Sequence, residues 1–172
     1  MLFWAAVVAV IMAFTGIFPA KRYTKFISWD ILVTIASAFA ISRAMILSGL
    51  ADAIAAGVIT LCNTLSPRFV LALIYIITNI ITEIITNNAA AAFSFPIALS
   101  AATQLGVSPT PLLVAIAIAA SASFCSPIGY QTNTIVQGLG GYRFRDFVRA
   151  GLPLSVIAFT VSMIFIPIFW EF

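Results

Sequence analysis

The chain consists of long apolar runs that are interrupted by short polar breaks. The apolar segments cover residues 2–18, 31–47, 69–85, 89–105, 112–124, 134–139 and 151–170. None of them alternates apolar and polar residues, as the strands of a membrane β-barrel do. The pattern therefore predicts an all-α integral membrane protein. Residues 48–65 are milder and rich in small side chains, and could form a helix that lies along the membrane surface.

Two of the polar breaks interrupt segments of unusual length. Thr86, Asn87 and Asn88 separate two runs that are both shorter than the roughly 20 residues of a spanning helix. Two short limbs around a polar tip predict a re-entrant helical hairpin over residues 67–105, although a plain capped turn between two full helices stays open. Residues 110–140 are too long for one straight span and carry a second break, which predicts a discontinuous transmembrane helix. Such a pair of interrupted segments indicates a transporter binding site.

Composition supports a membrane protein and argues against an enzyme. The chain is 63% hydrophobic and only 8% charged, whereas soluble domains carry about 25% charged residues. It has no histidine and no metalloprotease motif, so we expect no enzymatic activity and no catalytic residues. The start shows neither a basic region nor a small-residue cleavage site, so a signal peptide is not expected.

The net charge of +3 bears on topology rather than on nucleic-acid binding, which is not expected. The basic residues concentrate in segments 20–28 and 141–149, and the positive-inside rule places both in the cytoplasm. An even number of crossings must then separate them. The second helix and the broken helix supply two crossings, so the hairpin adds none or two, and its tip enters from the outer side. We expect a multi-pass protein of the plasma (inner) membrane, surrounded by lipid.

The two breaks offer groups for binding ions. A helix that stops inside a membrane leaves carbonyl groups unpaired at its C-terminal end and amide groups at its N-terminal end. The carbonyls suit a small cation and the amides an anion. Neutral side-chain oxygens are added by Thr86, Asn87, Thr132 and Asn133. Asn88 could cap the following helix or donate to a substrate oxygen, and Gly129 permits backbone geometry closed to other residues. One site could hold sodium and an anion side by side.

These motifs resemble a known family. The hairpin motif consists of Thr82-Glu83, Thr86-Asn87-Asn88-Ala89 and Pro96, and the second motif of Pro127–Asn133 with Gly138, Gly140 and Gly141. Both resemble the signatures of the divalent anion:sodium symporter (DASS) family. The resemblance implies that residues 1–172 form a single transmembrane transport domain. This domain would be the C-terminal repeat of a larger transporter whose N-terminal, inverted repeat is missing from this chain. It also implies a homodimer that works by an elevator movement.

The resemblance also implies site residues. The sodium site would consist of Thr86, Asn87, Gly129 and Asn133. The substrate site would consist of Thr86, Asn87, Asn88, Tyr130, Gln131 and Thr132. Tyr130 and Gln131 stand where dicarboxylate transporters of the family often carry Thr-Pro, and this form is more similar to sulfate permeases. The expected function is sodium-coupled uptake of a divalent anion, with sulfate ahead of a dicarboxylate.

Several alternatives stay open at this point. Other members of the wider ion transporter superfamily export arsenite or another anion, or exchange sodium for protons. A passive channel is an alternative because hairpin tips also build filters, and so is a non-transporting half. The Glu83 carboxylate could serve structure or function, and we assign it to neither site. Tyr130 and Gln131 could merely pack beneath the break. We expect Ser121 and Ser123 to serve close helix packing.

Overall fold

The computed structural model describes residues 2–15, 29–61 and 66–172, and the regular elements among them are all helices. The chain divides into two compact units, residues 1–33 and 34–172. The first unit holds α1 (Leu2–Phe14) and the start of α2 (Trp29–Leu47). The second holds the rest of α2 and all later helices. The prediction of an all-helical chain is confirmed for the described residues.

A sharp bend separates α2 from α3 (Leu50–Leu61). The segments 32–47 and 50–60 are inclined to one another by 73°. Gly49 lies between them with φ +73°, a left-handed conformation that favours glycine. The surface helix predicted over 48–65 therefore begins only after this glycine, and residues 62–65 lie outside the described part of the chain.

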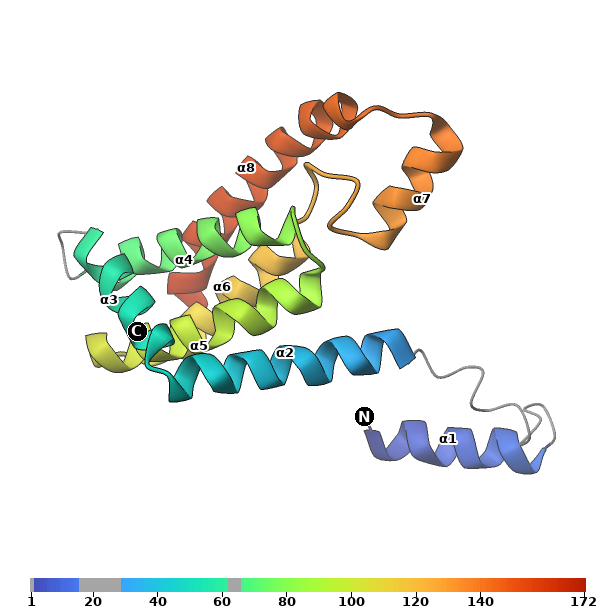
Figure 1. Cartoon of the computed structure of the whole chain (residues 1–172), viewed down its shortest axis with the longest axis horizontal. Helices are drawn as coiled ribbons and strands as arrows, with labels where there is room; N and C mark the ends of the chain where they lie inside the picture. The colour runs from blue at the N-terminus through green and yellow to red at the C-terminus, as the bar shows by residue number, and fades with distance from the viewer. Residues whose placement is uncertain (1, 16–28, 62–65) are drawn as a thin grey trace. The chain divides into compact units, whose positions relative to one another are not determined.

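The core of the larger unit is built from α4 (Pro67–Thr82), α5 (Asn87–Leu105) and α6 (Thr110–Ser121). These three helices lie side by side (Figure 1) and all contact one another. α3 packs on α5, and α8 (Phe144–Phe169) packs on α4 and α6. The rings of Tyr75 in α4 and Phe159 in α8 meet edge to face with centroids 5.4 Å apart. Many of the fully buried core residues of α5 and α6 are alanines, which let the helix backbones approach closely.

The predicted hairpin corresponds to α4 and α5, which are joined by residues 83–86 and pack against each other. Pro67 occupies the first turn of α4, where its missing N–H costs nothing. Gly106 ends α5 with φ +68°, a left-handed helix cap. The limbs fall within three residues of the predicted boundaries. That this hairpin turns back inside a membrane stays a prediction.

The predicted broken helix corresponds to α6 and α7 (Gln131–Gly140), separated by residues 122–130. α7 begins at Gln131 and not, as predicted, at Thr134. The amides of Asn133 and Thr134 both donate to the Tyr130 carbonyl, at 3.0 and 3.3 Å, and this closes the first helical turn. Gln131, Thr132 and Asn133 therefore belong to the first turn of α7 rather than to the break.

The last helix also begins earlier than predicted, at Phe144 instead of Gly151. The Arg143 amide donates to Asp146 Oδ2 at 2.8 Å, and the Asp146 amide donates to the Arg143 carbonyl at 2.9 Å. This reciprocal cap starts α8. The predicted basic loop over 141–149 is therefore wrong for residues 144–149, which form the start of α8. The other basic segment, 20–28, lies outside the described residues.

Among the described helices, α8 alone has the length and apolar composition of a membrane crossing. Counting the bent pair α2 and α3 as one span would give a second crossing. α4 and α6 are apolar but shorter than 18 residues. Only 11% of the apolar stretch of α8 is buried within the protein.

Gly151 marks a close approach that can be tested. A Cβ at this position of α8 would meet the Phe124 carbonyl and the Cys125 amide, whereas one at Gly138 in α7 would enter open space. We expect Gly151→Ala to destabilise the protein by about 1–3 kcal/mol because the break has no room for a methyl group. Gly138→Ala is the matched control and gains up to about 1 kcal/mol of helix stability. Thermal unfolding of the purified protein in detergent measures both. Equal melting temperatures for the two variants would contradict the close approach.

Candidate functional site

Four helix ends come together where the hairpin tip meets the helix break. α4 ends at Thr82 and α6 at Ser121, while α5 begins at Asn87 and α7 at Gln131. The Thr82 hydroxyl donates to the Ala120 carbonyl at 2.7 Å, which joins the two C-terminal ends. Two C-terminal helix ends, whose last carbonyls accept side-chain donors, therefore adjoin two N-terminal ends. Such an arrangement can stabilise a cation and an anion close together.

The Asn87 side chain connects the hairpin tip to both sides of the break. Its amide nitrogen lies 2.9 Å from Thr82 Oγ1, 3.2 Å from the Ala120 carbonyl oxygen and 3.1 Å from the Gly129 carbonyl oxygen. Carbonyl oxygens only accept hydrogen bonds, so the nitrogen and not the oxygen of the amide faces them. This nitrogen therefore joins the start of α5 to the end of α6 and to the break.

Serine hydroxyls hold the break against the end of α4. Ser123 Oγ donates to the Thr82 carbonyl at 3.2 Å, and Ser126 Oγ donates to the Glu83 carbonyl at 2.7 Å. The Gly129 amide in turn donates to Ser126 Oγ at 3.2 Å. Ser123, which we expect from the sequence to serve close packing, lies buried against Gly129, and its hydroxyl also bonds the backbone at the end of α4.

Gly129 is predicted to supply a backbone conformation closed to other residues, but the structure shows that its lack of a side chain is what matters. Its backbone does not adopt a positive φ, in contrast to Gly49, Gly106 and Gly141. A Cβ at Gly129 would instead collide with Ser123 Oγ and the Thr82 carbonyl oxygen. The residue therefore allows the break to approach the end of α4 closely.

Two asparagine side chains satisfy carbonyl groups that the break leaves without helical partners. Asn133 Nδ2 donates to the Ser123 carbonyl at 3.0 Å and to the Ser126 carbonyl at 3.1 Å. Asn79 Nδ2 donates to the Ala119 and Ala122 carbonyls at 3.3 and 2.9 Å. Both amides stabilise the irregular backbone, since an unpaired buried carbonyl is costly.

The structure brings together only some of the predicted site residues. Asn87 and Gly129 are in direct contact, and Asn133 binds the same break. The exposed remainder consists of Thr86, Asn88, Tyr130, Gln131 and Thr132. Thr86 and Tyr130 are the N-cap residues of α5 and α7, and neither side chain makes a capping hydrogen bond. The prediction that Asn88 could cap α5 is wrong because Asn88 lies inside its first turn.

Sequence reasoning missed three residues that build the site: Asn79, Thr82 and Ser126. All three are polar side chains in apolar surroundings, which is a signal by itself. Thr82 also lies about one helical turn before Thr86, on the approach to the tip. The signal was present for Ser126 as well, because a serine before a proline marks a break in a helix.

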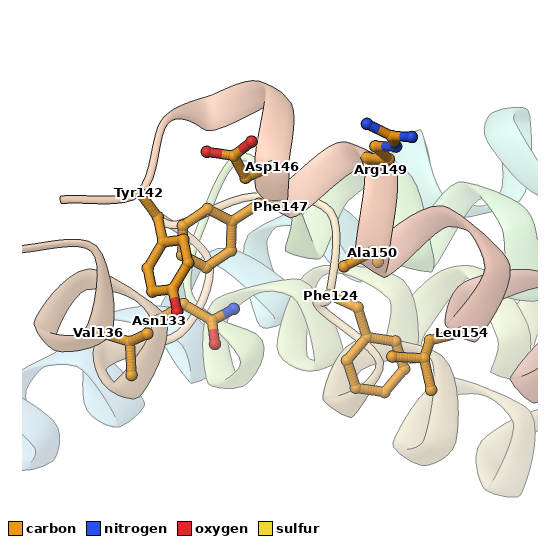
Figure 2. A pocket seen from close by; sticks show the side chains of 10 residues that line it. Phe124, Asn133, Val136, Tyr142, Asp146, Phe147, Arg149, Ala150 and Leu154 are labelled. Carbon is orange, nitrogen blue, oxygen red and sulfur yellow. The ribbon is translucent and has the colours of Figure 1, made fainter. Parts of the chain in front are cut away.

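A cavity of about 690 Å³ opens beside the site, between α7 and the first half of α8 (Figure 2). Phe124, Tyr142, Phe147 and Leu154 make its lining mostly apolar, and Asn133 lines it from the first turn of α7. Its charged lining residues are Asp146 and Arg149. Among the described residues there is no cluster of three or more His, Cys, Asp or Glu side chains suited to a metal.

Comparison with known proteins identifies the family. A model described as citrate transporter (CitMHS) matches residues 1–171. Sodium/sulfate cotransporter 2 from Chlamydomonas reinhardtii is 40% identical over 89% of this chain and 18% of its own length. The uncharacterized transporter YfbS from Escherichia coli is 32% identical over 98% of this chain and 28% of its own length. Solute carrier family 13 member 4 from Homo sapiens is 29% identical over 84% of this chain and 23% of its own length.

The chain spans between 18% and 28% of the length of these relatives. The resemblance to the DASS family is confirmed, and so is the prediction that the chain is not an enzyme, since the family and these relatives are transporters. Because the family model covers all but one residue, the chain belongs to the citrate transporter family.

Proposed function

We propose that this chain is the C-terminal repeat of a secondary active transporter that couples sodium to the uptake of a divalent anion. The observation that carries the proposal is the Asn87 amide, held between the carbonyl oxygens of Ala120 and Gly129 where four helix ends meet. The name of the Chlamydomonas relative, a sodium/sulfate cotransporter, supports sodium as the coupling ion and sulfate as the first candidate anion. A dicarboxylate is the second candidate.

The proposed sodium site lies on the carbonyl side of the break. Its ligands are the Asn87 side-chain oxygen, the Thr86 side chain, the Gly129 carbonyl and the Asn133 side-chain oxygen. Asn87 Nδ2 and Asn133 Nδ2 each face two backbone carbonyls, which holds each amide group in one orientation. Sodium is a hard cation that accepts such neutral oxygens, and the C-terminal ends of α4 and α6 add favourable partial charge.

The proposed anion site lies on the amide side. The exposed first turns of α5 and α7 present free backbone amides, and the side chains involved are Thr86, Asn87, Asn88, Tyr130, Gln131 and Thr132. Helix N-termini favour anions without a full positive charge nearby. A bound sodium ion a few ångströms away would strengthen the attraction, which couples the two ligands.

The remaining architecture follows from the family. We propose a multi-pass protein of the plasma (inner) membrane, in which a matching N-terminal repeat supplies the second hairpin of the site. The relatives are several times longer than this chain, which leaves room for such a repeat. The exposed apolar surface of α8 suits lipid contact. The re-entrant hairpin, the elevator movement and the homodimer belong to the same proposal.

Sodium-coupled anion uptake is directly measurable. In proteoliposomes with the whole transporter that contains this chain, we expect saturable uptake of labelled sulfate when sodium is present outside. Potassium in place of sodium should abolish it, and an excess of a four-carbon dicarboxylate tests the second substrate. Uptake that is independent of sodium would exclude the coupled mechanism. A voltage-driven current without saturation would indicate a channel.

Asn87→Ala tests the hairpin tip. We expect the sodium concentration for half-maximal uptake to rise about tenfold, because the variant loses one oxygen ligand and the bonds that place two carbonyls. Thr103→Ala is the matched control. Thr103 lies near the other end of α5 and its hydroxyl bonds only the Leu99 carbonyl. Unchanged sodium dependence in Asn87→Ala would remove Asn87 from the site.

The isolated chain should not transport. Because the described part of the chain supplies only one of the two proposed hairpins, the site would be incomplete, and we expect reconstituted chain 1–172 to show no sodium-dependent sulfate uptake. The same preparation joined to the N-terminal repeat is the positive control. Robust uptake by the isolated chain would refute the two-repeat site, unless crosslinking shows that two copies pair to imitate it.

A further inference from the structure

We infer that Glu83 is a positioning residue whose carboxylate fixes the helix break against the hairpin tip, and that it binds neither sodium nor the anion. The inference rests on the proposed function, because the groups that Glu83 places are the proposed sodium ligands. It assigns a role to the Glu83 carboxylate, which the sequence alone leaves open.

Both carboxylate oxygens of Glu83 are engaged by the break. Oε1 accepts the Cys125 backbone amide at 2.9 Å, and Oε2 lies 3.4 Å from the Ser123 hydroxyl, whose single proton it shares with the Thr82 carbonyl. The Glu83 backbone carbonyl accepts the Ser126 hydroxyl at 2.7 Å. One residue at the end of α4 therefore binds three positions of the break, each more than 35 residues away in the sequence.

The Cys125 peptide is also confined from the opposite side. α8 passes so close at Gly151 that an added Cβ would touch the Phe124 carbonyl and the Cys125 amide nitrogen. The Cys125 thiol lies 3.5 Å from the Ser155 hydroxyl of the same helix. Without Glu83, this amide would be pressed against α8 with no acceptor, since α6 has already ended at Ser121. A half-buried amide in that position needs a strong acceptor.

The contacts of Glu83 continue to the proposed sodium ligands. Ser126 Oγ, which donates to the Glu83 carbonyl, also accepts the Gly129 amide. The Gly129 carbonyl then accepts Asn87 Nδ2 at 3.1 Å. These bonds form a closed loop from the end of α4 through the break to the start of α5. The Ser126 bond uses the Glu83 backbone carbonyl, which any residue at this position keeps, whereas the carboxylate holds the adjoining Cys125 peptide. Release of Cys125 from the carboxylate would therefore act through Ser126 on the separation between the Gly129 carbonyl and Asn87.

Two conservative substitutions distinguish placement from charge. Glu83→Gln removes the charge but keeps an acceptor at the distance of Cys125 and a donor for Ser123. Glu83→Asp keeps the charge but shortens the side chain by one methylene, which withdraws it from the Cys125 amide. If Glu83 positions the break, the Asp variant is defective and the Gln variant is close to the wild type. If its charge binds the ion, the Gln variant is defective and the Asp variant is close to the wild type.

The experiment measures sodium activation of sulfate uptake in the whole reconstituted transporter that contains this chain. We expect Glu83→Asp to raise the half-activating sodium concentration about tenfold, the effect of losing one charge-assisted hydrogen bond, and Glu83→Gln to change it less than about threefold. Glu171→Asp is the control, because Glu171 is exposed near the C-terminus. Equal sodium activation in all variants, or a larger defect in Gln than in Asp, would overturn the inference.

Amide hydrogen exchange of residues 122–130 gives a readout that does not depend on transport. Faster exchange in Glu83→Asp than in Glu83→Gln and the wild type is the expected result, and equal exchange in all three overturns it. If the wild-type transporter shows no sodium-dependent uptake, the proposed function fails while the exchange result still decides whether Glu83 holds the break. The two failures are therefore distinguishable.

Discussion

The site depends on one constraint, which is that backbone groups freed by interrupted helices must find partners within the protein. α4 and α6 end beside each other, and each leaves carbonyl groups that no further helical turn satisfies. In an apolar environment an unpaired carbonyl costs several kcal/mol. The protein meets this demand with Asn79, Thr82, Asn87 and Asn133, whose side chains all donate to carbonyls around the break.

Because these donors are uncharged, they satisfy the backbone without supplying counter-ions of their own. In the proposed function, the site would take a cation and an anion from solution, and these would neutralise each other. A permanent Lys or Arg at the tip would hold the anion without sodium. Partial charges from helix ends bind either ion alone only weakly. Weak binding of each ion favours binding of sodium and the anion together, and it lets both ions be released.

The sequence predicts a helix or a turn correctly where a local pattern of apolar and polar residues is enough to determine it. Continuous apolar runs predicted the helices, and the polar tripeptide after Ile85 predicted the turn between α4 and α5 to within three residues. It failed at α7 and α8, because a helix start depends on which amides find a carbonyl. The Tyr130 carbonyl and the Asp146 carboxylate extend these helices towards the N-terminus, and neither bond is visible as hydrophobic periodicity.

The candidate site was predictable in its elements but not in its contacts. Asn87 and Gly129 were recognised from separate motifs, yet their contact depends on the missing Cβ of Gly129 and on Ser123, which was read as a packing residue. Glu83 shows the limit more clearly. A carboxylate in an apolar run reads equally well as an ion ligand or as a structural acceptor, and only its bond to the Cys125 amide separates the two roles. One carboxylate oxygen accepts the Cys125 amide and the other faces the Ser123 hydroxyl, so in our inference the charge most visible in the sequence places the neutral ligands beside it.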